Sequence, residues 1–115
     1  MKKSLIDANL AHPWDVTHEK AIAIQNSLQR HLVDENLVNT VTTVAGVDVS
    51  FPNKNARAAV VVLSFPALKP LDYAGAQIPL SFPYIPGLLA FREVPAVLAA
   101  LEKLQRWLDV FIFDA

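Results

Sequence analysis

Hydrophobic residues first recur at the spacing of an α-helix. Thr17 can cap the segment that follows, because its hydroxyl can accept a hydrogen bond from a backbone N–H of the first turn. Asp34-Glu35-Asn36 ends the pattern. We therefore predict a helix within a lead-in segment, residues 1–36. Its apolar stripe consists of Ala21, Ile24, Leu28 and Leu32.

The middle of the chain changes to the pattern of β-strands. Residues 44–51 are rich in β-branched valine and predict a strand, and residues 51–55 have the composition of a turn. Residues 58–65 are almost continuously apolar, which predicts a second strand that pairs with the first as a hairpin, is central in its sheet and is covered on both faces. Residues 71–78 predict a weaker third strand, which Pro79 stops.

A second helical pattern follows a proline-rich segment. Residues 79–87 hold too much proline for regular structure and predict a stiff loop. Pro95 suits the first turn of a helix that follows Glu93, and residues 110–113 predict a short last strand. The apolar stripe of this helix consists of Val94, Val97, Leu98, Leu101, Leu104 and Leu108.

Together these elements predict an α/β fold with a mixed sheet. An N-terminal helix precedes three strands, a helix and a fourth strand, and the last connection is long enough for a parallel crossover. Because no internal repeat is visible, we expect residues 1–115 to form a single domain. A strand as central as residues 58–65 normally has more cover, so one face of the sheet is expected to be partly bare, as in a fragment or a chain with an obligate partner.

Composition restricts the function classes. Hydrophobic residues make up 53% of the 115, which excludes disorder, and the absence of cysteine excludes disulfides, zinc ribbons and thiol catalysis. No signal peptide or membrane-spanning run is visible, so we expect a cytoplasmic protein with no membrane partner. The 10 Lys+Arg against 11 Asp+Glu give no bulk reason to expect nucleic acid. The histidines share no metal spacing and are expected at the surface: His12, His18 and His31.

Two aspartates stand where apolar residues would be expected. Asp48 lies mid-strand, where an unpaired buried carboxylate would be costly, and Asp114 follows the apolar strand 110–113. If the two strands are neighbours, both carboxylates reach one point, where Mg²⁺ or Mn²⁺ would satisfy them. The alternatives are an outward-pointing or arginine-paired Asp48, and an ordinary capping or terminal Asp114.

Glu93 could provide a third carboxylate. It lies where the stiff loop meets the second helix, so its side chain is favoured by the positive end of the helix dipole and could be aimed at the sheet edge. The alternative is a simple first-turn acid. Together with Asp48 and Asp114 it resembles the acidic cluster of phosphodiester-cleaving sites, in which metal ions activate a water.

The stiff loop places an aromatic side chain between two prolines. Tyr84, held between Pro83 and Pro86, could push into a stacked duplex and take the place of a displaced base. The alternative is a proline-rich turn in which Tyr84 packs on the core.

Four segments of the chain resemble the endonuclease V family. The first three follow in family order and at family-like separations, and the run from Pro83 to Pro95 is particularly specific. The resemblance extends from about the first helix to Ala115. The segments are Val44-Ala45-Gly46-Val47-Asp48-Val49-Ser50-Phe51, Pro83-Tyr84-Ile85-Pro86-Gly87, Phe91-Arg92-Glu93 and Phe111-Ile112-Phe113-Asp114.

The resemblance implies a ribonuclease H-like fold and a magnesium-dependent endonuclease of DNA repair, with manganese as a substitute. Members of the family hydrolyse the second phosphodiester bond 3′ to deoxyinosine, and some also cut RNA that contains inosine. Carried over by motif, Asp48 and Asp114 are metal ligands, and Glu93 completes the site and helps to activate the attacking water. The implied DNA-binding residues, whose tyrosine and prolines form a strand-separating wedge, are Pro83, Tyr84, Ile85, Pro86 and Gly87.

The chain also departs from the family. Ala115 stands where the family has glycine, and the family domain continues with a further strand, covering helices and much of the hypoxanthine pocket. Residues 1–115 therefore resemble the N-terminal portion of such a domain, without its C-terminal half. A second interpretation is open: an inactive remnant that binds nucleic acid or forms oligomers through the bare sheet face.

Overall fold

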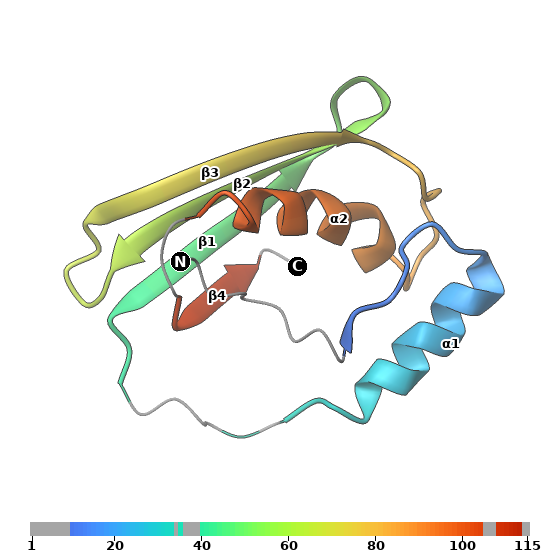
Figure 1. The fold of residues 1–115 in the computed structure, drawn as a ribbon, viewed down its shortest axis with the longest axis horizontal. Coiled ribbons are helices and arrows are strands. Elements are labelled where there is room, and N and C mark those ends of the chain that lie inside the picture. Colours follow the sequence, from blue (N-terminus) through green and yellow to red (C-terminus); the bar gives the residue numbers. More distant parts are fainter. Residues whose placement is uncertain (1–9, 34, 36–39, 105–107, 114–115) are drawn as a thin grey trace.

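A computed structural model describes residues 10–33, 35, 40–104 and 108–113 (Figure 1). These residues contain two helices and four strands, with a short 3₁₀ turn at Pro52–Lys54 after the first strand. In chain order they are α1 (His18–Gln29), β1 (Thr43–Ser50), β2 (Asn55–Ser64), β3 (Pro70–Pro79), α2 (Ala90–Leu101) and β4 (Val110–Phe113). In the part of the chain that the structure describes, no helix is both long and apolar enough to cross a membrane.

The strands form one mixed sheet in the order β3-β2-β1-β4. Neighbouring strands from β1 to β3 are antiparallel, whereas β4 runs parallel to β1. α2 is the crossover between β3 and β4 and lies across one face of the sheet (Figure 1). The predicted α/β fold with a parallel return strand is therefore confirmed.

The main core lies between α2 and the sheet. Alternate residues of β2 face α2 and are buried, among them Val60 and Val62, together with Ala96 and Val97 of the helix. The residues between them face the opposite side, where Val61 is 44% exposed. The prediction that this strand is covered on both faces is wrong for the described residues, and the prediction of one bare face is confirmed. We call this bare side the open face.

Both helices are shorter than the periodicity predicted. Lys20 donates its backbone N–H to the Thr17 hydroxyl over 3.2 Å, which confirms the predicted cap of α1. The helix ends at Gln29, because the next backbone bonds tighten to i→i−3, and Leu32 is left 77% exposed. Of the predicted stop, Asp34 and Asn36 lie outside the described residues.

α2 differs from the prediction at both ends. It begins at Ala90, before Glu93, so Pro95 lies inside the helix rather than in its first turn. It ends at Leu101. Leu104 and Leu108 are buried in the same core although they follow the helix. The two leucines continue the apolar pattern because they are buried in the core, and not because they belong to the helix.

One carboxylate fixes β4 against β1. Asp109 Oδ2 accepts the backbone N–H of Thr42 at 2.8 Å and that of Thr43 at 3.1 Å. It also accepts the Thr42 hydroxyl at 3.0 Å, and the Asp109 N–H donates to the Thr43 hydroxyl at 3.1 Å. The hydrogen bonds to the carboxylate hold the pKa of Asp109 below its ordinary value, and the bond from the Thr42 backbone N–H has the largest effect. They fix the parallel register in which Val44 pairs with Val110 and Val47 with Phe113.

We expect Asp109→Asn to lower the thermal unfolding temperature at neutral pH, because the amide carries no charge to attract the threonine donors. Since the folded-state pKa is depressed, the ionised carboxylate stabilises the fold above the unfolded pKa of about 4, and this advantage is lost as pH falls through the folded pKa. Melting curves between about pH 7 and pH 3 check this. The exposed Asp15→Asn is the control, and a difference from wild type that is independent of pH would contradict the assignment.

Candidate active site

Asp48 lies in β1 on the open face. Its neighbour Val47 is buried under α2, whereas Asp48 is exposed, as strand alternation requires. The Val49 N–H donates to Asp48 Oδ1 at 3.0 Å. The carboxylate is thus solvated within this structure, in agreement with the outward-pointing alternative, although β1 is an inner strand and not an edge.

Glu93 and Asp48 line the same cleft. The cleft has a volume of about 160 Å³ and is also lined by Phe113, the last residue of β4. Glu93 lies in the first turn of α2, which agrees with the alternative of a first-turn acid, and the helix dipole favours a carboxylate there. Asp114 follows Phe113 in the sequence and lies outside the described residues. The remaining lining residues are apolar: Val47, Val49, Leu89, Val94 and Val97.

A second, larger groove of about 580 Å³ on the open face meets this cleft at Asp48. Asp48 and Phe113 line both spaces, and Val61 and Ile112 contribute apolar walls to the groove. Asp48 therefore stands at a junction that is accessible from the open face and from the α2 side.

The donor chemistry of the cleft suits a hard divalent cation. Asp48 and Glu93 are carboxylates, and Mg²⁺ and Mn²⁺ prefer oxygen ligands. Within the described ranges, no group of three or more His, Cys, Asp or Glu side chains is close enough to hold a metal. The described residues contain two of the three predicted metal ligands, Asp48 and Glu93, whereas Asp114 lies outside them.

In the loop between β3 and α2, Tyr84 is exposed whereas residues on both sides of it are buried. Tyr84 is 69% exposed, whereas Phe82 and Leu88 are each 3% exposed. The alternative in which Tyr84 packs on the core is therefore wrong. Residues 85–88 form a turn in which the Leu88 N–H donates to the Ile85 carbonyl at 3.0 Å. Gly87 has a φ of 86°, as the third residue of a type II turn requires.

Arg92, in the first turn of α2, connects this loop to Phe51, the residue that follows β1. Its guanidinium donates to the Phe82 carbonyl at 3.2 Å and lies 4.9 Å from the centroid of the Phe51 ring. Arg92 is adjacent to Glu93 in the first turn. The contacts of Arg92 and Asp109 were not predicted from the sequence. Two signals in the sequence could have indicated the role of Asp109. It directly precedes the short apolar strand 110–113, and the pair Thr42-Thr43 precedes the valine-rich strand.

A second hydrophobic cluster supports the loop from the N-terminal side. Phe82, Leu88 and Phe91 are buried together with Ala21 of α1. Trp14 packs edge-on against Phe91, with ring centroids 5.3 Å apart. The segment before α1 consequently lies beside the loop and the start of α2 (Figure 1).

The histidines differ in their burial. His12 is half-buried, with its ring centroid 4.3 Å from that of Trp14, so it lies at the surface as predicted but is partly covered. A tilted contact between the two rings, which the spacing of the histidines does not show, covers part of His12. The same prediction is confirmed for His18 and His31, which are exposed.

Comparison with known proteins gives one consistent result. The family model for Endonuclease V matches residues 26–115. An Endonuclease V of Trichormus variabilis is 48% identical over 106 residues, which cover 90% of this chain and 48% of that protein. The chain thus spans about half the length of the relatives it matches.

Solved structures agree. The crystal structure of an Endonuclease V from Streptomyces avermitilis has a TM-score of 0.82 and 38% identity, covering 89% of this chain and 46% of that one. That of Ciona intestinalis Endonuclease V, in complex with a 23mer DNA that contains an inosine followed by a ribo-adenosine, has a TM-score of 0.72 and 29% identity. It covers 87% of this chain and 47% of that one.

We expect Gly87→Ala to destabilise the fold by about 1 kcal/mol, because an L-residue is strained at a positive φ. No atom lies within 4 Å of an added Cβ there, so the cost comes from the backbone alone. Thermal unfolding should show a fall of ~4 °C. Gly46→Ala, equally unobstructed and without a positive φ, is the matched control and should show no such fall. Equal melting temperatures for the two variants would refute the turn assignment.

Proposed function

The chain belongs to the endonuclease V family, and we propose that it carries the N-terminal part of a metal-dependent endonuclease of DNA repair. The proposed substrate is DNA that contains deoxyinosine, with inosine-containing RNA as a second substrate. The proposed reaction hydrolyses the second phosphodiester bond on the 3′ side of the lesion. The observation that carries this proposal is the cleft shared by Asp48, Glu93 and Phe113.

Three carboxylates are proposed to hold the metal. Asp48 and Glu93 line the cleft, and Asp114 directly follows Phe113, which lines it too. A bound Mg²⁺, or Mn²⁺ in its place, would supply Lewis acidity for activating water and stabilising the leaving oxygen. Glu93 is proposed to orient the attacking water and to accept its proton. Its position in the first turn of α2 keeps its side chain at the cleft.

The loop is proposed to separate the strands beside the lesion. Tyr84 is exposed, and its backbone is held by buried residues on both sides, so a ring that enters a duplex would not fold back onto the protein. Pro83, Ile85, Pro86 and Gly87 complete this wedge. Stacking of Tyr84 on a neighbouring base would offset part of the cost of displacing the damaged one.

We expect magnesium to raise the melting temperature of the wild-type chain and to support nicking of a duplex that carries one deoxyinosine. Asp48→Asn should abolish both effects, because it removes the charge while its carbonyl can still accept the Val49 N–H. Magnesium at about 100 times its Kd would stabilise the fold by ~2.7 kcal/mol. Thermal unfolding and gel analysis of nicked strands provide the measurements.

Asp15→Asn, which removes an exposed carboxylate away from the cleft, is the control and should respond to magnesium like wild type. An undiminished response in Asp48→Asn would remove Asp48 from the metal site. The remnant interpretation has one observation in its favour, the exposure of apolar Val61 and Ile112 on the open face. DNA binding by a folded chain without magnesium stabilisation or nicking would favour the remnant.

We expect Tyr84→Ala to weaken binding to deoxyinosine DNA about tenfold, since stacking of one base on an aromatic ring contributes ~1–3 kcal/mol. Binding to undamaged duplex should fall much less, because its bases stay stacked. Competition binding with the two duplexes measures the difference. Tyr73→Ala removes a tyrosine that is 80% exposed on β3 and is the matched control. Equal losses on both duplexes would eliminate the wedge.

A further inference from the structure

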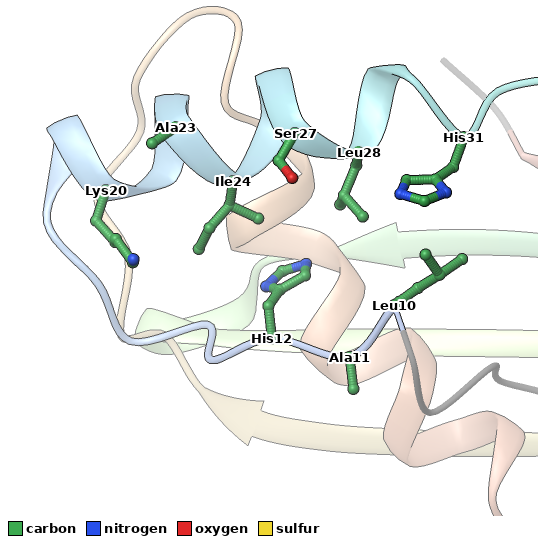
Figure 2. Close-up of a pocket in the computed structure, with 9 residues that line it drawn as sticks. All are labelled: Leu10, Ala11, His12, Lys20, Ala23, Ile24, Ser27, Leu28 and His31. Carbon is green, nitrogen blue, oxygen red and sulfur yellow. The ribbon is translucent and has the colours of Figure 1, made fainter.

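A cavity of about 260 Å³ lies between residues 10–12 and α1, away from the acidic cleft (Figure 2). We call it the α1 groove. Its apolar lining consists of Leu10, Ala11, Ala23, Ile24 and Leu28. Its polar lining consists of His12, Lys20, Ser27 and His31. None of the described residues that line it is acidic, in contrast to the cleft at Asp48.

His12 is held in one orientation at the groove. Its Nδ1–H donates to the Pro13 carbonyl at 2.9 Å, because a carbonyl oxygen can only accept. The ring also packs against Trp14 and lies 5.7 Å from the Phe91 ring. With the proton on Nδ1, the second ring nitrogen, Nε2, carries a lone pair and accepts a hydrogen bond, so the donors to a phosphate come from the α1 side of the groove.

The other polar groups approach the same space from α1. Lys20, Ser27 and His31 lie on one face of the helix and its C-terminal extension, and Figure 2 shows their side chains directed towards residues 10–12. The Lys20 ammonium, the Ser27 hydroxyl and the protonated ring nitrogen of His31 provide hydrogen-bond donors. The ammonium also supplies positive charge, and no described residue that lines the groove is a competing carboxylate. Such a set suits a phosphate group.

We propose that the α1 groove binds a phosphate of the nucleic-acid backbone. This inference rests on the proposed function for the identity of the ligand. Ile24 lines the groove and also packs on the cluster of Phe82, Leu88 and Phe91 that supports the loop of Tyr84. A nucleic acid whose base meets Tyr84 can therefore be held by its backbone at a rigidly connected second point. Phosphate contacts of this kind fix position and contribute affinity, not sequence preference.

The test is binding of the whole chain to a short undamaged duplex, without metal, followed by fluorescence anisotropy over a range of salt concentrations. The double variant Lys20→Gln/His31→Gln should bind about tenfold more weakly at low salt, and the magnitude of the slope of log K against log salt should fall by about 1, because one cationic contact is lost. Both side chains are exposed, so an unchanged melting temperature is expected and is to be verified.

The matched control is Lys69→Gln/His18→Gln. It removes the same residue types from exposed positions outside the groove, and its affinity should stay within about twofold of wild type. Equal losses in the two double variants would mean that only bulk charge matters and would overturn the proposal. So would an unchanged slope in Lys20→Gln/His31→Gln, or a wild-type chain that does not bind the duplex.

The outcome is independent of the nuclease proposal. The duplex carries no inosine and the assay contains no metal, so a failure to nick leaves the groove result intact. Conversely, a groove that does not bind phosphate leaves the metal response of Asp48 and the inosine preference of Tyr84 untouched.

Discussion

The parallel docking of β4 on β1 is the constraint on which the candidate site depends. A parallel pair cannot be closed by a tight turn, so its register must be fixed by contacts between distant residues. Asp109 provides these contacts, because one carboxylate oxygen accepts two backbone N–H groups that lie just before or at the start of β1. The end of β4 then comes to lie at the cleft that Asp48 and Glu93 line. Core packing of α2 on the sheet fixes the third side of that cleft.

Buried residues on both sides of Tyr84 hold the backbone of its loop in place although its side chain is exposed. Phe82 and Leu88 anchor the loop in a hydrophobic cluster, and Arg92 donates a hydrogen bond to the Phe82 carbonyl. Arg92 belongs to the same helical turn as Glu93, so the loop and the acidic cleft share one support. Through Phe91 this support extends to the N-terminal segment and the α1 groove. The proposed metal, base and phosphate contacts are thus parts of one connected structure.

The open face shows how an ambiguous pattern is resolved. The apolar run of β2 has hydrophobic residues on both sides, and the pattern cannot tell which side α2 covers. In the structure α2 lies over Val60 and Val62, and Val61 lines the open groove that leads to Asp48. The chain spans about half the length of its relatives, and the proposed nuclease activity concerns the domain that those relatives contain.

The sequence by itself determined the order and type of the helices and strands, the cap at Thr17, the turn chemistry of the loop, and the motifs that identify the family. These are local properties, set by side-chain period and by the backbone preferences of proline, glycine and threonine. Only the tertiary structure decided that Asp48 and Glu93 share a cleft, that Tyr84 points into solvent and that His12 packs against Trp14. It also decided where the helices end, because burial of Leu104 and Leu108 after α2 depends on the sheet beneath them. Such arrangements arise from contacts between residues far apart in the chain, as between Thr42 and Asp109, and no local pattern encodes them.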